Sequence, residues 1–316
     1  MVEFNTYIAA YIILSIGLSG LAINIAVARA VRKSTLFGYA FGALCFSQAV
    51  ADIGICGTFV TFVAGITVME PSWHTTYFGR RSGQLLIFFW EGSIWTHLFA
   101  AVNRSAAINL PIQYSQTFDK PKTTRFLMAF IWFVATMQAV PYFIPSCSMT
   151  FDPVSFTYAY GEGLCGEITE DYADKITSII VVATIATLDI TTFLRLLQRK
   201  MNKSSNTNEH SHKRRELRFF FQACAQSSVL MGGLIFFFYI VYLNLESPWY
   251  VFGTTTVVWL SVHVLDGIIV IIFNREVRNI IRGKHKVIIG SSQSNNHSSL
   301  AMNASQVAPH EDKHHE

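Results

Sequence analysis

Charged residues are scarce in this chain of 316 residues. They make up 14% of the sequence, whereas about 25% is usual in soluble proteins, and hydrophobic residues make up 51%. The sequence also lacks cysteines at Cys-x-x-Cys spacing, a cysteine–histidine cluster at zinc-binding spacing, a glycine-rich phosphate loop and a Gly-x-Ser-x-Gly motif. We therefore expect neither an enzyme nor a metal centre of the zinc type. The composition indicates a membrane protein.

Seven hydrophobic stretches are long enough to cross a bilayer, which requires about 20 mainly apolar residues. They lie at about 6–31, 38–69, 82–106, 125–147, 175–198, 217–244 and 248–273. No basic segment precedes the first stretch, so we interpret it as a retained span rather than a cleaved signal. The sequence predicts an all-α membrane protein, a seven-transmembrane helix bundle over residues 6–282. A short amphipathic helix at 275–282 and a disordered cytoplasmic tail at 283–316 are expected to follow the last span.

The basic residues indicate how the chain is oriented in the membrane. All but three of the 24 lysines and arginines follow spans one, three, five or seven, and only Arg80, Arg81 and Lys175 lie on the other side. Because basic residues are retained on the cytoplasmic side, residues 1–5 are expected outside the cell and the C-terminus inside. The polar stretch Met201–His212 then forms a flexible cytoplasmic loop. We expect a multi-pass protein of the plasma membrane.

Two of the five cysteines lie in the loop between spans four and five. This loop is on the predicted outer, oxidising side, and Cys147 and Cys165 lie eighteen residues apart within it. The other three cysteines, Cys45, Cys56 and Cys224, lie within spans. The sequence therefore predicts a disulfide bond between Cys147 and Cys165.

Polar residues within the spans are expected to face the interior of the bundle, because an acidic side chain in hydrocarbon costs about 2.5–3.5 kcal/mol. Span three contains Glu91 and His97. We interpret His97 as a hydrogen-bonding group between helices, whereas Glu91 is equally consistent with a functional role and with a protonated, hydrogen-bonded acid. We predict a mid-bundle polar hub, a candidate sodium site, from one residue in each of four spans: Asn24, Asp52, Ser93 and Asp266.

The order of these residues resembles a known receptor superfamily. Asn24, Asp52, Asp266, an Arg at the inner end of span three and a Trp in span four are similar to rhodopsin-like G-protein-coupled receptors. Narrower motifs follow in order: Trp95-x-His97-Leu98 with Asn103-Arg104, Arg214-Arg215-Glu216 with Phe220-Phe221-Gln222, and His263-x-x-Asp266-Gly267 running to Phe273-Asn274-Arg275-Glu276. Together they resemble the nematode serpentine chemoreceptors of the Srx type over residues 6–282.

The resemblance implies a chemosensory receptor in the membrane of a sensory neuron. It implies an unknown small-molecule ligand outside, a heterotrimeric G protein inside and no nucleic-acid partner. Asn103 stands where the superfamily favours an acidic residue and cannot form an ion pair with Arg104. We therefore predict that the inner lock, which also couples to the G protein, involves Asn103, Arg104 and Glu216.

The ligand pocket is expected near the outer end of span three. Span seven contains no Lys, which excludes a retinal Schiff base, and Leu86 occupies the position of the Asp of amine receptors. We predict a small, largely apolar ligand and a pocket formed by Leu86, Ile87, Trp90, Glu91, Phe237 and Thr256. The alternative function is a seven-helix ligand-gated channel subunit, as in insect odorant receptors, whose N-terminus lies inside the cell.

Overall fold

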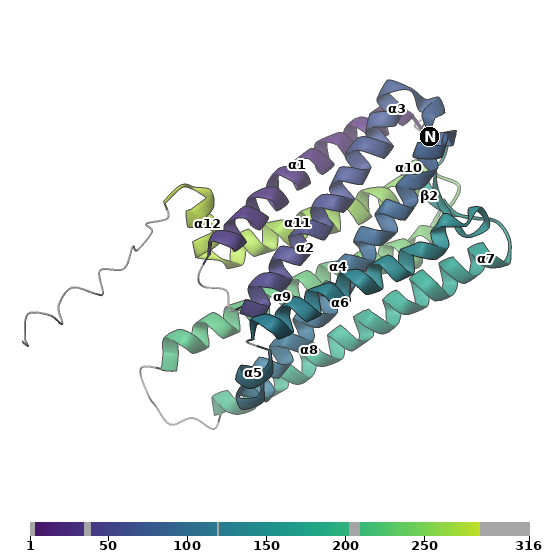
Figure 1. The fold of residues 1–316 in the computed structure, drawn as a ribbon. Coiled ribbons are helices and arrows are strands. Elements are labelled where there is room, and N and C mark those ends of the chain that lie inside the picture. The colour runs from purple at the N-terminus through teal and green to yellow at the C-terminus, as the bar shows by residue number, and fades with distance from the viewer. Residues whose placement is uncertain (1–3, 35–38, 119, 202–208, 285–316) are drawn as a thin grey trace, which may run out of the picture.

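The computed structural model describes residues 4–34, 39–118, 120–201 and 209–284. Within these ranges, seven helical segments are long and apolar enough to cross a membrane, and they form one elongated bundle (Figure 1). The predicted seven-helix, all-α membrane fold is confirmed. The predicted tail at 283–316 lies almost entirely outside the described residues.

Three of the seven segments are interrupted by π-helical turns. The first three spans are α1 (Thr6–Lys33), α2 (Tyr39–Thr58) continued by a π-helix (Phe59–Gly65) and α3 (Ile66–Met69), and α4 (Tyr77–Asn109). The fourth is α6 (Pro121–Ala139) with a 3-10 turn (Val140–Phe143), and the fifth is α7 (Leu164–Glu167), a π-helix (Ile168–Ile176) and α8 (Thr177–Met201). The last two are α9 (Glu209–Phe238) with a 3-10 turn (Ile240–Leu243), and α10 (Pro248–Phe252), a π-helix (Gly253–Val257) and α11 (Val258–Phe273).

Local sequence signals explain where several helices begin. The side chain of Asn5 accepts hydrogen bonds from the backbone N–H groups of Tyr7 and Ile8 and so caps α1. Thr76 caps α4 in the same way, which is why the third span begins at Tyr77 rather than at residue 82 as predicted. Proline, whose missing N–H is tolerated in a first helical turn, begins three helices: α6, α10 and the short α5 (Pro111–Thr117).

Other boundaries also differ from the sequence prediction. The fourth span runs from Pro121 to Phe143 instead of 125–147, because prolines break the helix after Phe143. The fifth begins at Leu164 rather than residue 175, since an acidic but amphipathic segment continues the helix outward. Helix α9 begins at Glu209, so the helix takes up the last residues of the predicted loop Met201–His212. The amphipathic helix predicted at 275–282 is α12 (Arg275–Ile281).

Helix α4 is the central element of the bundle. It packs against α2, α6 and α8 (Figure 1). Its buried residues occur on most of its circumference. A helix that is buried all round must satisfy its polar side chains with groups from its neighbours. Each site described below therefore includes a residue of α4.

A β-hairpin, which the sequence analysis missed, lies at the end of the bundle that carries the N-terminus (Figure 1). Strands β1 (Met149–Asp152) and β2 (Thr157–Tyr160) pair antiparallel, and the Cys147–Cys165 disulfide ties the ends of the loop together. Gly83 lets β1 lie directly on α4, because a Cβ there would collide with the carbonyl oxygen of Met149. Side chains from both strands are buried and join the core of the bundle.

Candidate functional site

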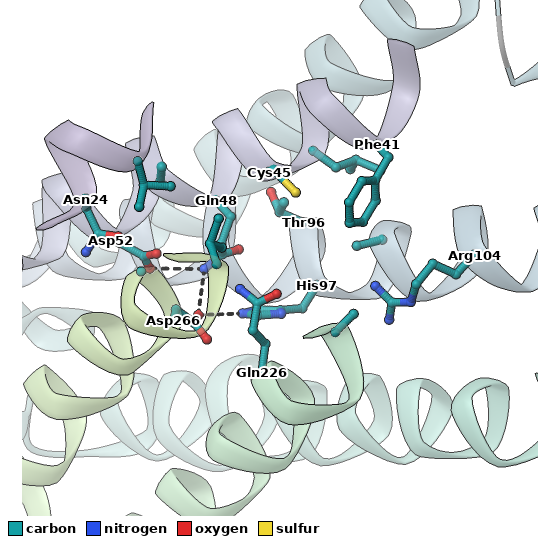
Figure 2. A pocket seen from close by; sticks show the side chains of 17 residues that line it. Asn24, Phe41, Cys45, Gln48, Asp52, Thr96, His97, Arg104, Gln226 and Asp266 are labelled. Atoms are coloured by element: carbon teal, nitrogen blue, oxygen red, sulfur yellow. Dashed lines mark hydrogen bonds and ion pairs between the residues drawn. The ribbon is translucent and has the colours of Figure 1, made fainter. Parts of the chain in front are cut away.

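One glutamine connects three of the four residues predicted for the polar hub, and Figure 2 shows its contacts with two of them, Asp52 and Asp266. The two N–H groups of Gln48 Nε2 are shared among three acceptors: Ser93 Oγ at 2.7 Å, Asp52 Oδ1 at 3.0 Å and Asp266 Oδ2 at 3.2 Å. All four side chains are buried. The structure thus brings spans two, three and seven together through Gln48, which the sequence analysis did not name. A buried amide donor between two carboxylates separates groups that would otherwise repel each other.

Each carboxylate of the hub also has its own histidine partner. His263 Nδ1 lies 2.8 Å from Asp52 Oδ1, and His97 Nε2 lies 3.0 Å from Asp266 Oδ2. All four residues are at most 6% exposed. Because an unpaired charge in a low-dielectric interior is very costly, these pairings explain how two acids are tolerated at the centre of the bundle.

Asn24 borders the same centre from α1. Its Nδ2 donates to the backbone carbonyl of His263 at 3.0 Å, which ties α1 to α11. Its Oδ1 is buried and has no hydrogen-bond partner among the described residues, and the same holds for Gln48 Oε1 and Asp266 Oδ1. A cavity of about 20 Å³, enough for one water-sized species, is lined by all three residues.

These oxygens fit a small, hard cation, which prefers oxygen ligands. Ligand atoms of Asp52, His263 and Asp266 also lie within 4.8 Å of one another. The sodium site predicted from the sequence is thus chemically compatible with the residues present. Ser93 is the member that fits least, since it does not line this cavity, whereas Asn24, Asp52 and Asp266 do.

A second, apolar pocket lies nearer the hairpin end, and Asp174 is its polar group. Trp90 Nε1 donates to Asp174 Oδ1 at 3.1 Å, Ser178 Oγ donates to the same oxygen at 3.3 Å, and the hydroxyl of Tyr160 donates to Oδ2. The cavity has a volume of only about 20 Å³ in this structure. Its lining is mostly aromatic and aliphatic: Trp90, Asp174, Leu230, Gly233, Leu234, Phe237, Phe238, Trp259 and Val262.

The structure brings two of the six predicted pocket residues, Trp90 and Phe237, to this cavity. Leu86 and Ile87 are fully buried elsewhere, and Thr256 Oγ1 donates to the carbonyl of Phe156 in the hairpin at 2.9 Å. Glu91 is buried, and its Oε2 has no hydrogen-bond partner among the described residues. Sequence reasoning missed Asp174, although it is the last acidic residue before a long apolar run.

At the other end of α4, Arg104 forms a buried ion pair. Its Nη2 donates to Asp189 Oδ1 of α8 at 3.3 Å, and the two side chains are 6% and 13% exposed. Asn103 is also buried, and its Oδ1 has no hydrogen-bond partner among the described residues. Glu216, predicted as the partner of Arg104, lies on α9, but its side chain is outside the described part of the structure. Asp189 is the only acidic residue in the apolar run 176–198, a signal that the sequence analysis overlooked.

Two of the sequence motifs meet between spans six and seven. Asn274 Nδ2, after the seventh span, donates to Gln222 Oε1 of the sixth at 2.7 Å and to the carbonyl of Val270 at 2.8 Å. Both side chains are buried. The motifs Phe220-Phe221-Gln222 and Phe273-Asn274 thus form one contact that joins spans six and seven.

Outside the spans, burial perturbs titratable groups that include Tyr160 of strand β2 and His74, which precedes α4. Burial raises the pKa of Tyr160 well above its ordinary value, and the neighbouring Asp174 carboxylate raises it further, so the phenol stays protonated and donates. Burial lowers the pKa of His74, whose Nε2 lies 2.9 Å from Thr67 Oγ1. Both groups are therefore neutral at physiological pH.

Comparisons with known proteins agree with the resemblance seen in the motifs. The family model described as serpentine type 7TM GPCR chemoreceptor Srx matches residues 14–274. Serpentine receptor class X 45 of Caenorhabditis elegans is 29% identical over 293 residues, which is 87% of this chain and 81% of that receptor. Serpentine receptor class X-43 of the same organism is 25% identical over 270 residues, 83% of this chain and 82% of the relative. With a family match over most of its length, this chain belongs to the Srx family of serpentine, seven-transmembrane chemoreceptors.

Proposed function

We propose that this Srx chemoreceptor binds a small molecule at the hairpin end of its bundle and activates a heterotrimeric G protein at the other end. Its family consists of chemoreceptors, which are a non-enzymatic class. The observation that carries the proposal is the buried pair of Arg104 and Asp189, because a single helix, α4, connects it to the pocket and the hub. The family match does not favour the alternative of a channel subunit.

The resting state is the one in which Arg104 is paired. Removing one partner of a buried ion pair leaves the other charge uncompensated and costs about 3–5 kcal/mol, so separating Arg104 from Asp189 without a new partner for Arg104 is unfavourable. Asn103 offers no charge to Arg104, and Asp189 supplies that charge from another helix. Because Arg104 and Asp189 lie on different helices, the ion pair is sensitive to a movement of α8 relative to α4.

Ligand binding provides such a movement. The apolar pocket between α4, the π-helix Ile168–Ile176 of span five, α9 and α11 holds about one water, so an organic ligand must displace side chains such as Trp90 and Phe237. A ligand that binds better to a widened pocket shifts the population toward the state in which α8 and α9 have moved. Arg104 then loses Asp189 and becomes available to the G protein.

The polar hub lies between the pocket and the ion pair. Its hydrogen bonds join spans two, three and seven, and a sodium ion bound by oxygens of Asn24, Gln48, Asp52 and Asp266 would stabilise the arrangement described here. The ion adds positive charge beside two carboxylates and so favours the packing of spans two, three and seven described here. His97 and His263 compete with it for the same two carboxylates.

The receptor is proposed to lie in the plasma membrane with its N-terminus outside. The distribution of basic residues supports this orientation, and the disulfide-bonded hairpin then lies in the oxidising extracellular space. An epitope tag at each terminus, stained in intact and in permeabilised cells, distinguishes this orientation from that of the channel subunit. Staining of the C-terminal tag in intact cells would contradict it.

The function is tested by measuring G-protein activation in transfected cells. A panel of small odorants is applied, and dissociation of co-expressed G-protein subunits is recorded together with surface expression. We expect a response to some members of the panel that is lost in Arg104→Ala at equal surface expression. A full response from Arg104→Ala would refute the proposed coupling mechanism.

A further inference from the structure

A large hollow lies at the outer end of α4, beneath the hairpin. Its volume is about 720 Å³, which falls in the range of 300–1,000 Å³ usual for small-molecule sites, whereas the apolar pocket holds about 20 Å³. We name this hollow the outer vestibule. It is lined by three segments: His74 to Gln84, Phe143 to Phe151, and Tyr160 to Glu162.

We propose that the outer vestibule binds an organic carboxylate, with the guanidinium groups of Arg80 and Arg81 as its counter-charges. This inference rests on the proposed function in one respect, since a carboxylate bound in the vestibule would influence signalling through its effect on the apolar pocket. The binding itself is independent of any G protein.

The charges of the outer face support this assignment. Arg80 and Arg81 are two of the three basic residues on that side, and neither forms an ion pair with a described residue. The third, Lys175, lies 3.5 Å from Asp171. The surrounding loops are rich in acidic residues, and Glu162 even lines the vestibule, yet the two guanidinium groups remain available to a ligand.

Aromatic rings and a carbonyl hold the guanidinium of Arg81 in place. It lies 4.6 Å from the ring centroid of Tyr77 and 5.4 Å from that of Phe143, and its Nη1 donates to the carbonyl of Phe143 at 3.3 Å. Its Nε is buried and has no acceptor among the described residues. A fixed guanidinium with unused N–H groups matches the two oxygens of a carboxylate.

A second buried atom lacks a partner in the same wall. Gln84 is 4% exposed, and its Nε2 donates to the carbonyl of Tyr142 at 2.5 Å, which leaves Oε1 as an acceptor without a donor among the described residues. A hydroxyl or amide N–H on the ligand would satisfy it. The rings of Tyr77, Phe143 and Phe151 offer apolar surface, so the ligand is expected to combine a carboxylate with an apolar body.

The vestibule is connected to the apolar pocket by hydrogen bonds. Tyr160 lines the vestibule, and its hydroxyl donates to Asp174, which lines the pocket and accepts from Trp90. A ligand that moves Tyr160 therefore changes the partners of Asp174. This connection gives the vestibule a physical route to the helices that form the pocket.

The test uses the purified, full-length receptor in lipid nanodiscs. Medium-chain and aryl-substituted carboxylic acids, each paired with its methyl ester and with the amine of the same skeleton, are tested for thermal stabilisation and for affinity. We expect some acids to stabilise the wild-type receptor and their esters and amines to have no effect. Arg80→Gln with Arg81→Gln should raise the dissociation constant of such an acid by about ten- to a hundredfold.

Three further variants control for folding and for general charge effects. Arg80→Gln alone changes an exposed residue and should still weaken binding, Glu162→Gln should strengthen it, and Lys175→Gln should leave it unchanged because that lysine lies outside the vestibule. Any one of four results would overturn the proposal. Acids and esters stabilise the receptor equally, amines bind instead of acids, no acid stabilises the receptor, or an acid binds Arg80→Gln as tightly as it binds the wild type. The two proposals can fail separately. If the receptor binds carboxylates but none of them activates the G protein, the proposed function alone is refuted. If Asp189→Asn activates the G protein without ligand but the receptor binds no carboxylate, this inference alone is refuted.

Discussion

The two ends of α4 carry the same residue type in opposite circumstances. At the outer end, Arg80 and Arg81 border a wide hollow and form no ion pair with any described residue. At the inner end, Arg104 is 6% exposed and is paired with Asp189 at 3.3 Å. A guanidinium near water keeps its hydration, whereas a buried one needs a protein partner. The difference indicates that the outer arginines are suited to recognition and the inner one to a conformational restraint.

The largest effect is expected from breaking the inner pair. Asp189→Asn keeps the size of the side chain but leaves Arg104 without a counter-charge, which destabilises the resting state by about 3–5 kcal/mol. We expect ligand-independent G-protein activation to rise by at least about tenfold at equal surface expression. Asp171→Asn, which removes the exposed partner of Lys175, serves as the control and should have no effect. Basal activity equal to wild type would show that the pair does not restrain the receptor.

The outer end is tested by removing the disulfide. Replacing both Cys147 and Cys165 by Ser should destabilise the folded outer loop by about 3 kcal/mol in the chain-entropy model. Since Thr150, Phe151 and Tyr160 of the hairpin line the vestibule, binding of carboxylates should weaken while basal activation stays unchanged. Thermal unfolding and ligand binding of the purified receptor measure the effect, and free thiols at both positions in the wild type would contradict the prediction.

The hub between the two ends should respond to sodium. Asp52→Asn keeps a hydrogen-bond acceptor for His263 but removes the charge that a cation needs. Basal activity is measured in sodium and, as the reference, in an organic cation. We expect the variant to need about tenfold more sodium than the wild type for the same inhibition, since one charged contact is worth about 1.5–3 kcal/mol. If wild type and variant respond equally to sodium, the hub has a structural role alone.

A smaller effect is expected from pH at the outer end. Burial lowers the pKa of His74 below its ordinary value of 6.5, so the unfolded chain binds a proton more readily than the folded one. The stability contributed by this group is therefore complete above about pH 6.5 and decreases as the pH falls through that value toward the folded pKa. His74→Gln should remove this part of the acid sensitivity, measured as the melting temperature of the receptor between about pH 7.5 and 5.5. An identical pH dependence in both proteins would exclude His74 as the cause.

The smallest effect concerns Glu216, which begins the sixth span near a group of arginines. A partly exposed ion pair is worth about 0.2–1 kcal/mol, so Glu216→Gln should raise basal activation by no more than about two- to fivefold. Because Asp189 already holds Arg104, the change should be far below that of Asp189→Asn. A larger effect from Glu216→Gln than from Asp189→Asn would identify the sixth span as the source of the restraint.

Several properties of this receptor depend on local sequence alone. A run of about 20 apolar residues must form a helix in a bilayer, because only a helix satisfies every backbone group within one segment, and so the seven spans were predicted correctly. The family was predicted correctly from the order of short motifs along the chain. The limits of the spans were less accurate. A cap such as Thr76 and an amphipathic extension such as Leu164–Glu167 move a boundary without changing the mean hydropathy of the run.

Only the tertiary structure decided which side chains meet. The pairing of Arg104 with Asp189, of Asp52 with His263 and of Asp266 with His97 depends on the rotation and tilt of neighbouring helices, which residue spacing within one helix does not determine. The same holds for the hairpin, since strands of four residues carry little signal until Gly83 and the disulfide bring them onto α4. Sequence set the chemistry available along each helix, and packing selected the partners, because a buried charge is stable only where another helix supplies its complement.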